Sequence, residues 1–168
     1  QVRELRFNAW IVILPPDEAA AEAKKWFDQG FRSAKVKVGG NVDADRDRIQ
    51  AIREAVGSKM QLRADANAGY SVEDGIRLAK LLEPFNMQLL EQPVAAEDLA
   101  GMAKVRQSTS IPIMADESII DYASLIAVIK SDSADIVKLK VMKQGGFLNT
   151  RRMLETATAA GLRVVIGH

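Results

Sequence analysis

The sequence reads RADAN at residues 63–67, LEQP at 90–93 and MADES at 114–118. In each stretch a mainly apolar run stops at a carboxylate, as it does where a buried strand ends and a functional loop begins. The three carboxylates are spaced by 26 and 25 residues, which is enough for one strand, one helix and two loops. This spacing predicts repeated βα units with an acidic side chain at the end of three successive strands.

The same alternation extends along the whole chain. Runs rich in Val, Ile and Leu predict strands at residues 7–13, 33–38, 61–65, 88–91, 113–115, 136–140 and 163–166. Apolar residues at helical spacing predict helices at residues 16–29, 43–56, 72–82, 96–107, 122–130 and 148–160. Repeated βα units require a parallel sheet, so we expect an α/β fold in one domain spanning residues 1–168. The periodicity fits an open doubly wound sheet and a barrel equally well.

Composition and charge exclude several classes of protein. The net charge is +1, from 23 basic and 22 acidic residues, which does not indicate a nucleic acid or an anionic membrane as partner. The absence of cysteine excludes disulfide scaffolds, thiolate metal sites and cysteine nucleophiles. The longest apolar stretches, such as residues 9–14, are too short to span a membrane, and no signal peptide pattern is present. We therefore expect a cytoplasmic protein.

The strand-end acids are Asp65, Glu91 and Asp116. Because the carboxyl ends of parallel strands gather at one edge, we expect these side chains to converge. Converging carboxylates repel unless they are partly protonated or share a cation, and oxygen ligands favour a hard ion. Mg2+ is the expected cofactor, with Mn2+ as the alternative. The competing interpretation is that these acids form capping hydrogen bonds at βα turns.

Lysines flank the acids in the sequence. Lys35 and Lys37 lie two residues apart and share one face of their strand, and Lys140 ends the sixth strand. A lysine that points into an enclosed, positively charged site loses stabilisation of its ammonium form and can act as a base. The alternative for the first pair is a solvated stripe on an edge strand.

Five motifs, in this order, resemble the muconate lactonizing branch of the enolase superfamily, which also contains mandelate racemase. They are Lys35-Val36-Lys37, Asp65-Ala66-Asn67, Glu91-Gln92-Pro93, Asp116-Glu117-Ser118 and Lys140 with Gly145-Gly146. The resemblance covers the chain from about Phe7 to its end. It implies a TIM-like (β/α) barrel, here partial, with about seven parallel strands and six helices.

The resemblance also implies the chemistry of the site. Asp65, Glu91 and Asp116 would bind Mg2+, which holds the carboxylate of a small-molecule substrate. The proton α to that carboxylate would be removed to form an enediolate, giving racemisation, epimerisation or cycloisomerisation, the last as in muconate cycloisomerase. The chain would thus be an isomerase.

The same resemblance assigns the neighbouring polar residues. Lys37 and Lys140 would act as acid and base from opposite sides of the substrate, and Lys35 would favour the neutral form of Lys37. Asn67 and Glu117 would contact the metal ligands rather than the metal itself.

Several other residues that could belong to the site are expected to have different roles. Lys140 is preferred to Lys138 because it lies nearer the strand end and stands six residues before Gly146, so Lys138 is expected to be structural. His168, the only histidine, is expected to be a bystander or a substrate contact. Both tryptophans and the six methionines are expected to be core or packing residues.

Two alternatives and one structural expectation remain. Lys140 could form a Schiff base in a metal-free barrel aldolase, or the chain could be an inactive barrel fragment that serves as a structural or assembling module. With 168 residues, the chain is short for a barrel of about 250. We expect it to lack an eighth strand and the N-terminal capping domain, and to form a homo-oligomer.

Overall fold

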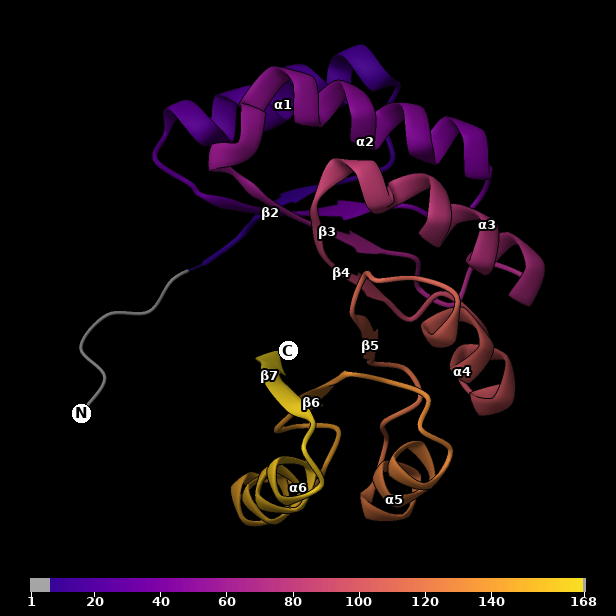
Figure 1. Cartoon of the computed structure of the whole chain (residues 1–168). Helices are drawn as coiled ribbons and strands as arrows, with labels where there is room; N and C mark the ends of the chain where they lie inside the picture. Colours follow the sequence, from indigo (N-terminus) through magenta and orange to yellow (C-terminus); the bar gives the residue numbers. More distant parts are fainter. Residues whose placement is uncertain (1–6, 168) are drawn as a thin grey trace.

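Figure 1 shows the computed structural model, which describes residues 7–167. Within that range seven strands form one sheet in sequence order, and every neighbouring pair is parallel. The strands are β1 (Ala9–Ile11), β2 (Ser33–Lys37), β3 (Gln61–Asp65), β4 (Met87–Glu91), β5 (Ile113–Ala115), β6 (Ile136–Lys140) and β7 (Arg163–Gly167). The fold is a partial TIM-like barrel, as predicted.

Six α-helices connect the strands and form an outer arc around the sheet (Figure 1). They are α1 (Pro16–Asp28), α2 (Val42–Val56), α3 (Val72–Leu82), α4 (Leu99–Gln107), α5 (Tyr122–Lys130) and α6 (Phe147–Ala159), with short 3-10 helices η1 (Gly57–Lys59) and η2 (Glu83–Phe85). Local capping sets several helix starts; Asp121, for example, forms a reciprocal capping box with Ser124 at the start of α5. None of the helices in the described part combines the length and apolarity that a bilayer crossing requires.

The two faces of the sheet have different partners. Side chains such as Val36, Ala64 and Leu139 are buried with those of the helices in the main hydrophobic core. The alternate residues point to the inner face of the barrel, where Leu89, Met114 and Ile136 form a separate small cluster. The polar strand residues lie above this cluster, toward the carboxyl ends of the strands.

For two elements, the predicted ends differ from the observed ends by more than two residues when both ends are added together. Strand β1 was expected at residues 7–13 but covers only Ala9–Ile11, because only these residues pair with β2. Helix α4 was expected from residue 96 but begins at Leu99, because the side chain of Asp98 caps it by accepting a hydrogen bond from the Gly101 backbone N–H.

Candidate active site

The three predicted acids lie in a row at the carboxyl ends of adjacent strands. Asp65 and Glu91 are the last residues of β3 and β4 and are register partners, and Asp116 directly follows β5. Their exposed fractions are 0%, 1% and 3%. Buried carboxylates need charged or hydrogen-bonding partners, and lysines supply them here.

One lysine bridges each neighbouring pair of acids. The Nζ atom of Lys35 lies 2.7 Å from Asp65 Oδ2 and 2.9 Å from Glu91 Oε2. The Nζ atom of Lys138 lies 2.9 Å from Glu91 Oε1 and 3.1 Å from Asp116 Oδ2. Acids and ammonium groups therefore alternate along the row.

A further lysine stands at each end of the row. Lys37 Nζ lies 2.6 Å from Asp65 Oδ2 and also donates to Asn67 Oδ1. Lys140 Nζ lies 2.8 Å from Asp116 Oδ1. The two residues predicted as acid and base thus occupy opposite ends of the carboxylate row.

Asn67 and Glu117 join the site as predicted neighbours of the acids. The Asn67 backbone N–H donates to Asp65 Oδ1 at 3.2 Å, and its side-chain amide donates to Glu117 Oε1 at 2.8 Å. The other oxygen, Glu117 Oε2, is buried and has no hydrogen-bond partner within residues 7–167. One buried carboxylate oxygen near the site is therefore unsatisfied in this part of the chain.

Comparison with known proteins identifies the family. The family described as "Enolase C-terminal domain-like" matches residues 18–168. The chain belongs to this family. The predicted resemblance to the enolase superfamily is therefore confirmed.

Relatives of this enolase C-terminal domain-like chain include epimerases and racemases. It is 39% identical over 155 residues to an L-Ala-D/L-Glu epimerase of Bacillus subtilis, covering 90% of this chain and 42% of the relative. It is 40% identical over 152 residues to a D-Ala-D/L-Ala epimerase of Cytophaga hutchinsonii, covering 90% of this chain and 41% of the relative. The chain thus spans less than half the length of these curated relatives.

A solved structure shares the fold. The dipeptide epimerase of Cytophaga hutchinsonii, complexed with Mg and the dipeptide D-Ala-L-Val, superposes with a TM-score of 0.94 at 38% identity. The match covers 97% of this chain and 44% of that one.

The acids at the two ends of the row are held ionised. Burial alone would raise the pKa of Asp65, but hydrogen bonds from Lys35 and Lys37 outweigh it and keep that pKa below its ordinary value. Burial opposes ionisation of Asp116 in the same way, yet the contact with Lys140 contributes to a pKa well below the usual range. Both end acids therefore carry negative charge near neutral pH.

The centre of the row behaves differently. Burial and the neighbouring charge of Asp65 raise the pKa of Glu91, and Lys35 and Lys138 offset this only in part. Burial would lower the pKa of Lys138, but its contacts with Glu91 and Asp116 raise it above the ordinary lysine value. These contacts favour the charged form of Lys138 between the two acids.

The acids suit a hard divalent cation in their chemistry. They offer only oxygen ligands, and Glu117 adds the unsatisfied oxygen beside them. Within residues 7–167 no three acidic or histidine side chains surround a common point as metal ligands, because Lys35 and Lys138 lie between the acids. The residues therefore fit Mg2+ by donor type, and the ligand set stays a prediction.

Sequence reasoning missed two residues that shape the site. Lys138 was expected to be structural, although it shares the face of Lys140 by the two-residue strand period and bridges two of the acids. The fully buried Gln92 accepts hydrogen bonds from the backbone N–H groups of Asp116 and Ser118, at 3.1 and 3.2 Å. Its position directly after Glu91 was the only sequence signal for this role.

The expectations for Trp10 and His168 can be compared with the structure in turn. Trp10 was expected to be a packing residue, but 59% of it is exposed, so that expectation was wrong. His168 lies outside the described residues, and its role stays a prediction.

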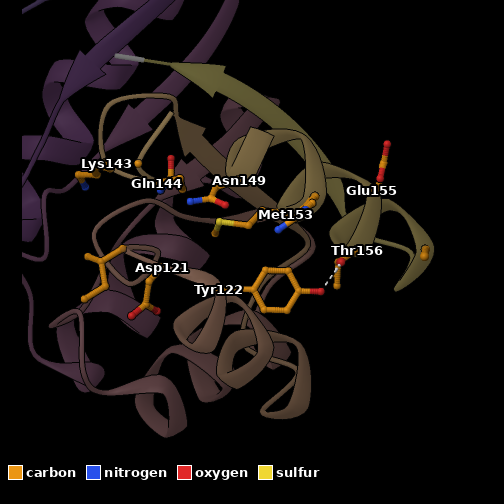
Figure 2. Close-up of a pocket in the computed structure, with 12 residues that line it drawn as sticks. Asp121, Tyr122, Lys143, Gln144, Asn149, Met153, Glu155 and Thr156 are labelled. Atoms are coloured by element: carbon orange, nitrogen blue, oxygen red, sulfur yellow. Dashed lines mark hydrogen bonds between the residues drawn. The ribbon is translucent and has the colours of Figure 1, made fainter. Parts of the chain in front are cut away.

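A hollow of about 880 Å³ lies between the start of α5 and helix α6 (Figure 2). The Tyr122 hydroxyl and Thr156 Oγ1 lie 2.7 Å apart across it. Lys143 and Gln144 line the hollow and also reach the site, since Lys143 Nζ is 3.4 Å from Asp116 and Gln144 Oε1 accepts from the backbone N–H of Lys140. The three acids themselves do not line it.

Proposed function

We propose that this chain carries the proton-transfer site of a magnesium-dependent isomerase that removes and returns the proton α to a substrate carboxylate. The observation that carries the proposal is the placement of Lys37 and Lys140 at opposite ends of one row of buried acids. Two proton carriers so placed can serve opposite faces of a carbon held between them, which is what racemisation or epimerisation requires.

Asp65, Glu91 and Asp116 would hold Mg2+, which when bound supplies positive charge beside the substrate carboxylate. Lys35 and Lys138 contact the same oxygens, so they would compete with a divalent ion for them. Metal affinity would therefore depend on how easily these ammonium groups give way.

The relatives favour epimerisation over cycloisomerisation. Those reported above are named for epimerising Ala-Glu and Ala-Ala dipeptides, and one was solved with Mg and a dipeptide. We propose a dipeptide or another N-substituted amino acid as the substrate class. Cycloisomerisation would use the same lysines and remains the second outcome of the same site.

Deuterium exchange at the α-carbon tests the assignment. In D2O with Mg2+, NMR should show exchange and epimerisation of L-Ala-L-Glu and L-Ala-D-Glu. Lys37→Ala and Lys140→Ala should each lower epimerisation by about 10³-fold, because each removes one of the two proton carriers. Each variant should keep exchange with only one of the two dipeptides, and the two variants should keep opposite ones.

Lys143→Ala is the matched control, since it removes a lysine near Asp116 that has no assigned role in proton transfer. Wild-type rates in both lysine variants would overturn the proposal. Borohydride trapping of a carbonyl substrate on Lys140 in excess chelator would favour the aldolase instead. The inactive module would be favoured if Mg2+ does not stabilise the protein, or if it stabilises Asp65→Asn and Glu91→Gln as much as wild type.

A further inference from the structure

Trp10 has an unusual position on the inner face of the barrel. It is the middle residue of β1 and the register partner of Lys35, so alternation places its side chain on the same face as the site lysines. Its exposed fraction is 59%, whereas the side chains of Lys35 and Lys37 are only 18% and 21% exposed. A large indole ring therefore faces open space beside a closely packed charge network.

The ring also contacts the predicted proton carrier. Lys37 Nζ lies 5.9 Å from the centroid of the Trp10 ring, within the range of cation–π attraction. The same ammonium group contacts Asp65, so the ring and the acid bound it from different sides. The indole is therefore the apolar surface that lies next to the ammonium group of Lys37.

We infer that Trp10 is a specificity-determining residue that forms an apolar wall beside Lys37 and selects carboxylates with an apolar side chain on the carbon that exchanges its proton. The inference rests on the proposed function.

The charges of the site support an apolar preference. The four lysines of β2 and β6 are all already paired with acids of the row. A substrate with an acidic side chain would lose water against the indole, which offers a carboxylate no countercharge. An apolar side chain would gain by burial against the same ring.

A single-fluorophore protein tests the contact directly. The chain has two tryptophans, and Trp26 packs edge-to-face on Phe31 in a different part of the fold, with ring centroids 5.0 Å apart. Trp26→Phe therefore leaves Trp10 as the only tryptophan. With Mg2+ present, L-Ala-L-Met should change its fluorescence saturably and bind about tenfold more tightly than L-Ala-L-Glu, which has a side chain of similar length.

Trp10→Ala and Trp10→Phe then test selectivity, with both dipeptides titrated by calorimetry. Trp10→Ala should bring the Met-to-Glu affinity ratio close to one, and Trp10→Phe should keep most of the preference because it keeps a flat apolar face. Far-UV circular dichroism checks the fold of each variant, which an exposed position should tolerate.

The outcomes separate two kinds of failure. If both dipeptides bind the wild type and Trp10→Ala leaves their ratio unchanged, the inference is wrong and the proposed function stands. If neither dipeptide nor the α-proton exchange assay shows any interaction with Mg2+ present, the proposed function fails and the inference fails with it.

Discussion

Strands β2 and β6 each carry two lysines separated by one residue, and the two pairs approach the carboxylate row from opposite ends. In both pairs the first lysine bridges two neighbouring acids: Lys35 bridges Asp65 and Glu91, and Lys138 bridges Glu91 and Asp116. The halves of the site therefore mirror each other around Glu91.

The second lysines of the pairs are held differently. The ammonium group of Lys37 is held by the side chain of Asn67 and by the ring of Trp10, in addition to its acid. For Lys140, the side chain of Gln144 instead holds the backbone N–H. The β2 side restrains the ammonium itself, and the β6 side restrains the strand end that carries it. The two lysines predicted as proton carriers thus differ in the groups that hold them.

Removal of an end acid should have the largest effect on stability. Asp65→Asn and Asp116→Asn should each lower the free energy of unfolding by about 3 kcal/mol without divalent cations, because each leaves lysine charges without their main partner. Urea unfolding measures this. Asp28→Asn, in an exposed ion pair with Lys24, should cost less than about 1 kcal/mol. A large effect at only one end would disprove the mirror arrangement.

Removal of a lysine that bridges two acids should have the second-largest effect, on the affinity for Mg2+. Lys35→Met and Lys138→Met should each tighten Mg2+ binding by about tenfold, because each removes a positive charge that contacts two of the predicted ligands. Isothermal titration calorimetry with Mg2+ alone measures the affinity. Lys143→Met should change it less, because Lys143 contacts only Asp116, at 3.4 Å. Unchanged or weaker binding in Lys138→Met would contradict the competition.

The comparison also shows what the sequence could reveal. The strand period placed Lys35 and Lys37 on one face, and the same rule applied to β6 would have found Lys138. Distance to the strand end and the spacing to Gly146 favoured Lys140 over Lys138, but the long side chain of Lys138 also reaches the acids. Gln92 was beyond such rules, because its role depends on a left-handed turn with φ of 37° that no strand pattern predicts.

Glu91, at the centre of the row, should change how the free energy of unfolding depends on pH. The folded-state pKa of Glu91 is raised by burial and by Asp65, so the folded state binds this proton more tightly than the unfolded state. Its contribution to stability is greatest below the ordinary glutamate pKa and is lost as pH rises through the folded pKa. The stability of Glu91→Gln relative to wild type should therefore rise with pH across that window.

Urea unfolding at several pH values, with chelator present, measures this difference. The end acids predict the opposite sign, because their lowered pKa values give stability that is present above the ordinary aspartate pKa and lost as pH falls through the folded pKa. A difference between Glu91→Gln and wild type that falls with rising pH would show that Glu91 behaves like its neighbours.

The smallest expected effect is on α-proton exchange, and it should differ between Lys37 and Lys140. Asn67 has φ of 44°, which glycine adopts without strain, so Asn67→Gly leaves the turn intact and removes the side-chain contacts with Lys37 and Glu117. Loss of one restraint should slow α-proton exchange about fivefold for the dipeptide diastereomer that depends on Lys37, through poorer positioning of its ammonium. Exchange of the diastereomer that depends on Lys140 should not change. Equal slowing of both would mean that Asn67 supports the whole row, and that the different restraints on Lys37 and Lys140 have no catalytic consequence.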